Sequence, residues 1–178
     1  VRRGCSFYPT AFLYNQAKPD GLTVGNWNGM LGLQQHLGLN GVAFDAPKFE
    51  PIGAPVRQNQ TCVITKASGI TSLEQWMSSN KPVKLGGFGP GSTPSDMARV
   101  VSAALGLPMQ LVEGYKGGAE VRLALDSGEL EWMCGLAWEI AKSTWRKQLE
   151  YISVVVLAMP KAHPEIPKVP LAINFAKN

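Results

Sequence analysis

The chain has 178 residues, of which 45% are apolar and 17% charged, and its net charge is +4. This composition is typical of a folded globular protein and argues against a disordered tail. The lysines and arginines are scattered, which argues against a nucleic-acid binder. The longest apolar run, 152–159, is far shorter than the roughly 20 residues that span a bilayer. A mildly basic chain favours an acidic small ligand.

Glycines and prolines punctuate the first third of the chain and separate short candidate elements. In chain order we expect a helix at 10–17, a turn at 19–21, a strand at 22–25, a helix at 29–37 capped by Asn28, a strand at 60–66 and a helix from 71 or 72 to 79.

Strands and helices then alternate more regularly, which predicts an α/β fold with largely parallel strands. We expect strands at 83–86, 109–113, 131–135 and 151–158, and helices at 94–105, 119–126 and 137–144. The helix at 94–105 has the clearest periodicity, with one predicted buried face made of Met97, Val100, Val101, Ala104 and Leu105. The segment 160–170 is rich in proline, so we expect it to be irregular.

Neither the cysteines nor the histidines form a recognisable reactive or metal-binding motif. Cys5, Cys62 and Cys134 lack zinc-ligand spacing, so no metal is predicted. A disulfide is compatible with them but not indicated, and Cys134 is expected to be a small core residue. His36 and His163 lie outside any nucleophile motif, so we predict that the protein is not an enzyme. The loop 87–92 lacks both the P-loop lysine and the GxGxxG spacing, and no cofactor is expected.

The loop before Pro94 is the first candidate ligand site. It brings Gly91, Ser92, Thr93 and Ser95 to a helix start, where free backbone amides and small hydroxyls suit a carboxylate. The other interpretation, an ordinary capped helix after a tight turn, is the commoner one in proteins.

Two further strand-to-helix loops have the same form. One contains Tyr115, Gly117 and Gly118, with no side chain placed to cap the helix; the other contains Asn26 and Trp27. A plain glycine turn and a core tryptophan are the simpler interpretations. Since ligands of α/β sheets bind at the carboxyl ends of strands, the three loops are candidates to converge. This site requires that the helices beginning at Pro94 and Gly118 do not lie on opposite faces of the sheet and are not sealed beneath side chains. Otherwise we expect no receptacle, and the receptor interpretation fails.

Five segments in order resemble the substrate-binding proteins of tripartite tricarboxylate transporters, the Bug-type periplasmic receptors. They are Lys18–Thr23, Gly87–Ala98, Gly114–Glu120, Ser127–Glu131 and Pro164–Pro170. The resemblance implies a type II periplasmic-binding-protein-like α/β fold, a three-layer sheet with helices on both faces. It also implies a periplasmic location, a small carboxylate ligand and membrane transporter subunits as partners.

By this resemblance one lobe is near complete and the other partial, with crossings at 66–69 and around 149–153. We therefore expect residues 1–66 to form a partial first lobe, 67–150 a second lobe and 151–178 a return to the first. The family's opening strand and final helical stretch are expected to lie outside the sequence, as in a fragment truncated at both ends. The alternative is a shortened structural or interaction module that keeps the fold without binding ligand and forms a homodimer.

Overall fold

The computed structural model describes residues 7–54 and 58–176. It divides into two compact units. The first unit comprises residues 1–55 together with 91–93, and the second unit comprises 56–90 together with 94–178. No helix in the described ranges has the length and apolar character needed to cross a membrane.

The first unit is built from two short helices and connecting loops. Helix α1 spans Phe7–Asn15 and α2 spans Leu31–His36, followed by a 3-10 turn at Ala46–Lys48. The Asn28 side chain accepts a hydrogen bond from the Met30 amide at 3.1 Å, so Asn28 orders the entry to α2, close to its predicted capping role.

Aromatic side chains hold the first unit together. The Phe49 ring lies at the centre of the group, with centroid distances of 4.8 Å to Trp27, 5.6 Å to Tyr14 and 5.9 Å to Phe44. Such tilted and edge-on pairs stabilise beyond the area they bury. This cluster takes the place of a sheet, because no residue from 7 to 54 is part of a strand.

The strand predicted at 22–25 does not form. Among the described residues, the backbone groups of residues 23–27 make no hydrogen bond to another backbone group. The Leu22 amide donates to the Asp20 carboxylate at 3.0 Å, which is a local turn contact and not a strand pairing. A strand needs a neighbour to satisfy its ladder, and none is present in this part of the structure.

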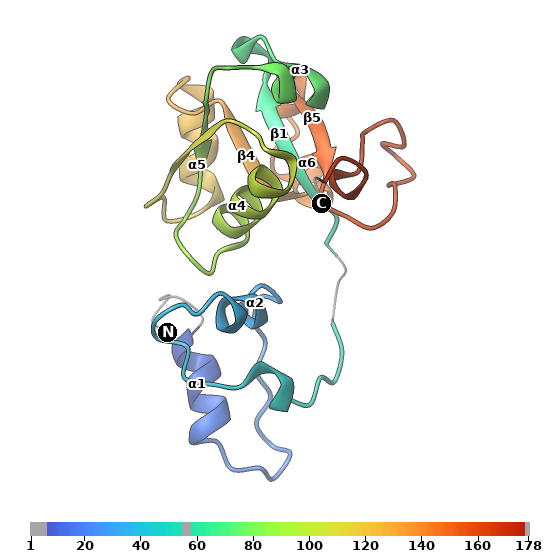
Figure 1. Ribbon diagram of the computed structural model, residues 1–178. Coiled ribbons are helices and arrows are strands. Elements are labelled where there is room, and N and C mark those ends of the chain that lie inside the picture. The colour runs from blue at the N-terminus through green and yellow to red at the C-terminus, as the bar shows by residue number, and fades with distance from the viewer. Residues whose placement is uncertain (1–6, 55–57, 177–178) are drawn as a thin grey trace. The chain divides into compact units, whose positions relative to one another are not determined.

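Within the described residues, the second unit contains one mixed five-stranded sheet and four helices. Figure 1 labels β1, β4 and β5 of this sheet with α3, α4, α5 and α6 around them. Its elements in chain order are β1 Gln60–Thr65, α3 Leu73–Ser78, β2 Val83–Gly86, α4 Thr93–Leu105, β3 Met109–Val112, α5 Gly118–Asp126, β4 Trp132–Ala137, α6 Trp138–Ser143 and β5 Ile152–Leu157. The strand order is β3-β2-β4-β1-β5. The strands β3, β2 and β4 are parallel, whereas β1 is antiparallel to both of its neighbours. The predicted strand positions are therefore confirmed, but the expectation of largely parallel pairing holds for only part of the sheet.

Helices cover both faces of this sheet, which gives the expected three layers. One core cluster joins Trp76 of α3 and Val101 of α4 to the sheet, and the other joins Val121 and Leu125 of α5 and Ala141 of α6 to its opposite face. Since successive strand residues point to opposite faces, Trp132 and Met133 of β4 contribute to different clusters.

The buried face of α4 differs from the predicted one. Ala98, Val101, Ser102 and Leu105 are buried, whereas Val100 is 46% exposed. Ser102 is tolerated in the core because its hydroxyl donates to the Leu107 carbonyl at 2.7 Å. The periodicity located the helix correctly but placed its apolar face slightly out of phase.

The predicted division into lobes needs correction. β1 lies between β4 and β5, so residues 60–66, assigned to a partial first lobe, belong to the second unit's sheet. β5 pairs with β1 over Ile152–Leu157, so residues 151–178 do not return to the first unit. The predicted crossings at 66–69 and 149–153 thus lie inside one unit.

A disulfide joins Cys62 to Cys134 across β1 and β4. The two residues are directly opposite each other in the ladder, and both are buried, which confirms that Cys134 is a core residue. The sequence separation of 72 residues conceals this pairing. Cys5 lies outside the described residues.

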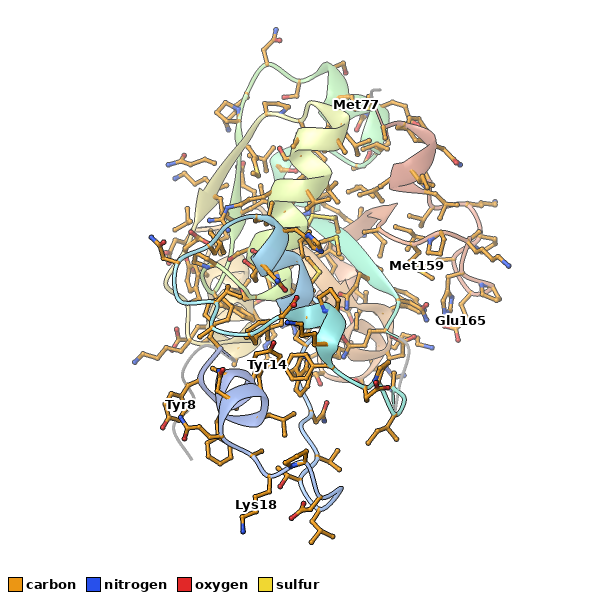
Figure 2. All side chains as sticks on the ribbon, turned by 60° about the horizontal axis from the view of Figure 1, so that its bottom comes forward. Tyr8, Tyr14, Lys18, Met77, Met159 and Glu165 are labelled. Carbon is orange, nitrogen blue, oxygen red and sulfur yellow. A yellow bond between two sulfur atoms is a disulfide. The ribbon has the colours of Figure 1, made fainter. Side chains whose placement is uncertain are left out.

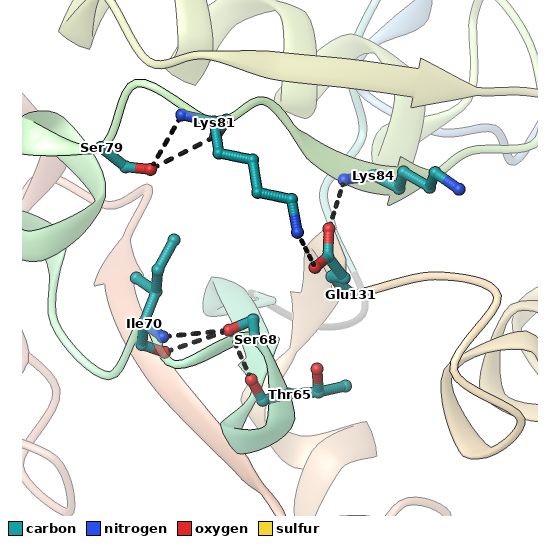
Figure 3. Close-up of polar contacts among 7 residues, drawn as sticks. All are labelled: Thr65, Ser68, Ile70, Ser79, Lys81, Lys84 and Glu131. Atoms are coloured by element: carbon teal, nitrogen blue, oxygen red, sulfur yellow. Dashed lines mark hydrogen bonds and ion pairs between the residues drawn. The ribbon is translucent and has the colours of Figure 1, made fainter.

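A group of polar contacts lies at the end of the sheet where β2 and β4 begin (Figure 3). The Glu131 carboxylate accepts the Lys84 amide at 3.2 Å and lies 3.8 Å from the Lys81 ammonium. Beside it, the Ser68 hydroxyl donates to the Thr65 carbonyl at 2.7 Å and accepts the Ile70 amide at 3.2 Å. These side chains join strands and turns at this end of the sheet.

Candidate functional site

The carboxyl ends of β2 and β3 define the candidate site. The two strands are parallel and in register, with Gly86 opposite Val112, and the Gly87 amide donates to the Val112 carbonyl at 2.9 Å. The loop that leads to α4 and the loop that leads to α5 therefore leave the sheet at the same end, where the carboxyl ends of β2 and β3 lie.

The two helices then cover opposite faces, because α4 packs in one core cluster and α5 in the other. Our requirement that they avoid opposite faces is thus not met. The two helix starts therefore do not form the single receptacle that we predicted. Their loops still leave the carboxyl ends of adjacent parallel strands, the end at which open α/β sheets bind ligands.

The start of α4 is filled by its own side chains. Ser95 is fully buried, and its hydroxyl accepts the Gly89 amide at 3.0 Å. Gly87 packs so closely on Ser95 that a Cβ at position 87 would collide with the hydroxyl. Ser95 thus holds the loop in shape by accepting the Gly89 amide, and ligand contact through its O–H stays a prediction.

The other predicted residues near this helix start fall in the segment grouped with the first unit. Thr93 accepts a hydrogen bond there from the Asn28 side-chain amide. Gly91 has a φ of +83°, a backbone conformation that favours glycine. Gly91 and Ser92 both have further interactions within the protein. For these three positions ligand contact stays a prediction.

The start of α5 is more open. Gly117 is its N-cap and provides no side-chain hydrogen bond, and a Cβ built on Gly117 or Gly118 would meet nothing within 4 Å. The first amides of a helix have no acceptor within the helix, so those of Gly118 and Ala119 are available. The exposed Lys116 adds a positive charge beside them, and its ammonium has no ion-pair partner in the described ranges.

One part of this helix start is already used. The Glu120 carboxylate accepts the Lys116 amide at 2.8 Å, and Lys116 is the residue before the N-cap Gly117. In a capping box the third helical residue accepts the amide of the N-cap itself, so this is a related contact displaced by one residue. It does not use the amides of the helix itself.

Tyr115 is oriented toward a side chain of its own unit. Its hydroxyl donates to the Glu129 carboxylate at 2.7 Å, and its ring packs against the core cluster of α5. Burial, with the hydrogen bond to the Glu129 carboxylate, raises the pKa of Tyr115 to about 12. The hydroxyl is therefore engaged within the protein, and ligand contact by Tyr115 stays a prediction.

An ion pair that the sequence did not reveal braces the two loops. Arg99 of α4 lies 2.7 Å from Glu113, the residue after β3, and 3.6 Å from Asp96. It therefore connects one helix start to the loop that leads to the other. The partners lie 14 residues apart, and only the fold brings them together.

Asn26 and Trp27 belong to the first unit, where Trp27 packs on Phe49 and Gly25. Trp27 is half-buried there and is not part of a buried core. Ligand contact by Asn26 and Trp27 stays a prediction. Within residues 7–54 and 58–176, no group of three or more His, Cys, Asp or Glu side chains is placed to hold a metal ion.

Solved structures of solute-binding proteins share this fold. A TctC solute-binding protein from Polaromonas, without ligand, is 19% identical over 96% of this chain and 58% of its own, with a TM-score of 0.72. MatC from Rhodopseudomonas palustris with bound malate is 20% identical over 83% of this chain and 50% of its own, with a TM-score of 0.65. A protein from R. palustris with adipate is 19% identical over 75% and 45%, with a TM-score of 0.61.

This chain thus has the α/β fold of TctC and Bug-type periplasmic solute-binding proteins, and it spans about half of their length. No protein-family profile and no curated protein matches the sequence. The likeness is therefore one of three-dimensional structure.

Proposed function

We propose that this chain is a solute-binding receptor, or a major part of one, that holds a small carboxylate for a tripartite tricarboxylate-type uptake system. It binds its ligand and passes it on to membrane transporter subunits without chemical conversion. Two of the structures with the same fold hold malate and adipate, both dicarboxylates, and this makes a dicarboxylate the first ligand to test.

The proposal rests chiefly on the open start of α5. Here two glycines leave room for a ligand, the helix dipole contributes a partial positive charge, and Lys116 adds a full one. A carboxylate seated at this point would accept hydrogen bonds from the first amides of the helix. The net charge of +4 would favour its approach.

A periplasmic location is part of the proposal. The buried Cys62–Cys134 disulfide supports it, because structural disulfides persist in oxidising compartments such as the periplasm and are rare in the cytosol.

Thermal unfolding in the presence of malate, adipate and citrate tests the proposal. A ligand at 100 times its Kd stabilises a protein by about 2.7 kcal/mol, which for a chain of this size raises Tm by about 5 °C or more. Absence of any shift with every mono-, di- and tricarboxylate tried would contradict receptor function.

The variant Gly118→Asp locates the site. A side chain fits at position 118, and an acidic residue in the first turn favours a helix by about 0.3–1 kcal/mol, so the fold should persist. The new carboxylate would compete with the ligand, and the thermal shift should disappear. Gly53→Asp is the matched control, because position 53 is equally open but lies in the first unit; it should keep the full shift.

The exposed apolar side chains of the first unit favour a second candidate function, an interaction module that keeps the fold without binding ligand. A protein that associates with itself but gives no thermal shift with any carboxylate would favour this function over the receptor.

A further inference from the structure

The first unit has an apolar groove of about 380 Å³ on its surface. One wall is helix α1, with Tyr8 and Phe12, and the other is the extended segment that includes Thr23 and Val24. Figure 2 shows Tyr8 on the outer side of this helix. All residues that line the groove belong to the first unit.

Close packing fixes the two walls against each other. A Cβ at Gly25 would collide with the ring of Trp27 and come within 2.7 Å of the Leu13 side chain of α1. Trp27 is in turn held by Phe49. The groove is therefore anchored on the aromatic cluster of the first unit.

The same surface carries projecting apolar groups. Leu22 and Val24 are 87% and 69% exposed, on a segment whose backbone from residue 23 to residue 27 makes no hydrogen bond to a described backbone group. Such a segment can pair with another extended chain, as an edge strand does. The groove and the projecting side chains of Leu22 and Val24 thus lie side by side on one surface.

We propose that a second copy of this chain covers this surface, with Leu22 and Val24 of each copy lying in the groove of the other. A two-fold interface uses the same patch on both partners, so it requires a patch that is complementary to itself. A groove beside projecting apolar side chains that can fill the same groove of another copy fulfils that requirement. The proposal goes beyond carboxylate binding, whose candidate site lies in the second unit.

The available apolar area fits a dimer. Tyr8 is 79% and Phe12 44% exposed, and with Leu22 and Val24 they offer on the order of 400 Å² of apolar side-chain surface per copy. Homodimer interfaces are about 65% apolar, so this area corresponds to about 600 Å² per partner, the lower end of the standard range.

Electrostatics does not oppose the contact. The sequence of the first unit contains Arg2, Arg3, Lys18 and Lys48 against Asp20, Asp45 and Glu50, so its formal charge is 4 − 3 = +1. Two copies that meet through the first unit therefore bring little like charge together, although the whole chain carries +4.

Sedimentation velocity over a concentration series, without added carboxylate, tests the proposal. The unaltered protein should form a reversible dimer. The double variant Leu22→Glu/Val24→Glu should raise the dimer Kd by about 30-fold or more, the factor that corresponds to the loss of one interface hot spot. Circular dichroism should be unchanged, because both side chains point into solvent in the single copy.

The matched control is Leu123→Glu/Ile173→Glu, which changes two apolar residues of the second unit that are 62% and 66% exposed. It should leave the dimer Kd unchanged. A protein that stays monomeric at all concentrations would overturn the proposal. So would a dimer that Leu22→Glu/Val24→Glu leaves intact, since its interface would then lie elsewhere, for example at a sheet edge.

Discussion

The second unit places helices on both faces of a sheet and joins two of its strands by a disulfide, whereas the first unit relies on loops around an aromatic cluster. Within residues 7–54, Leu31 and Phe44 are the only buried apolar residues, and six of the ten exposed large ones lie there. Buried apolar area is the main favourable term in folding, so the two units should differ in stability and respond to different substitutions. Tryptophans allow the comparison, because Trp27 lies in the first unit and the other four lie in the second.

The largest effect should follow loss of the disulfide. Cys62→Ala/Cys134→Ala opens a loop of 72 residues, which should lower the free energy of unfolding of the second unit by about 4 kcal/mol. Urea titration of protein labelled with 5-fluorotryptophan, followed by fluorine NMR, should show an earlier transition for the four tryptophans of the second unit and none for Trp27. Dithiothreitol on the unaltered protein should act in the same direction. A common shift of all five signals would mean that the two units unfold together.

Gly25→Ala should affect the first unit alone. The added methyl group meets the Trp27 ring and Leu13, and such overpacking costs about 2 kcal/mol. In the same experiment the Trp27 signal should move and its transition should come earlier, while the second unit keeps its midpoint. The control, Gly53→Ala, adds a methyl group to open space. If Gly25→Ala leaves Trp27 unchanged, the close packing of the groove wall is wrong.

The smallest effect concerns Tyr115 in the second unit. Its pKa of about 12 lies above the ordinary value of 10.0, so the stabilisation that this raised pKa reflects is fully present below pH 10 and is lost as the pH rises toward 12. Glu129→Gln should lower the Tyr115 pKa toward 10 without reaching it, because burial remains. Ultraviolet titration of tyrosinate checks this against Glu113→Gln, which should change nothing. An identical titration of Glu129→Gln and the unaltered protein would contradict the contact.

Strands and helices alternate regularly in the second unit, and this made their positions predictable from the sequence. The strand at 83–86 was predicted to the residue, and the helix at 94–105 to within one residue. Strand direction was harder, because the antiparallel pairing of β1 depends on where β4 and β5 lie and not on local pattern. In the first unit the strand at 22–25 was predicted from composition, but its formation requires a partner strand.

At the candidate site the sequence predicted the loops but not the side-chain partners. Glycines and turn residues marked the starts of α4 and α5, and the structure brings their loops to the carboxyl ends of adjacent strands. The engagement of Ser95 by Gly89, and of Tyr115 by Glu129, depends on distances that loop composition does not determine. Helix position follows from local pattern, whereas the availability of a hydroxyl follows from its neighbours in space.

The proline-rich segment after β5 has a protective consequence. The Leu157 amide donates to the Pro170 carbonyl at 2.8 Å, and Glu165 fastens the segment to α6 by accepting from Trp138 at 2.8 Å and Lys142 at 2.7 Å. This covers the end of β5, one of the two outer strands of the sheet. The other, β3, is only four residues long. Fibril growth by addition of strands requires long, uncovered outer strands. In this sheet one outer strand is covered at its end and the other is short, which disfavours such growth.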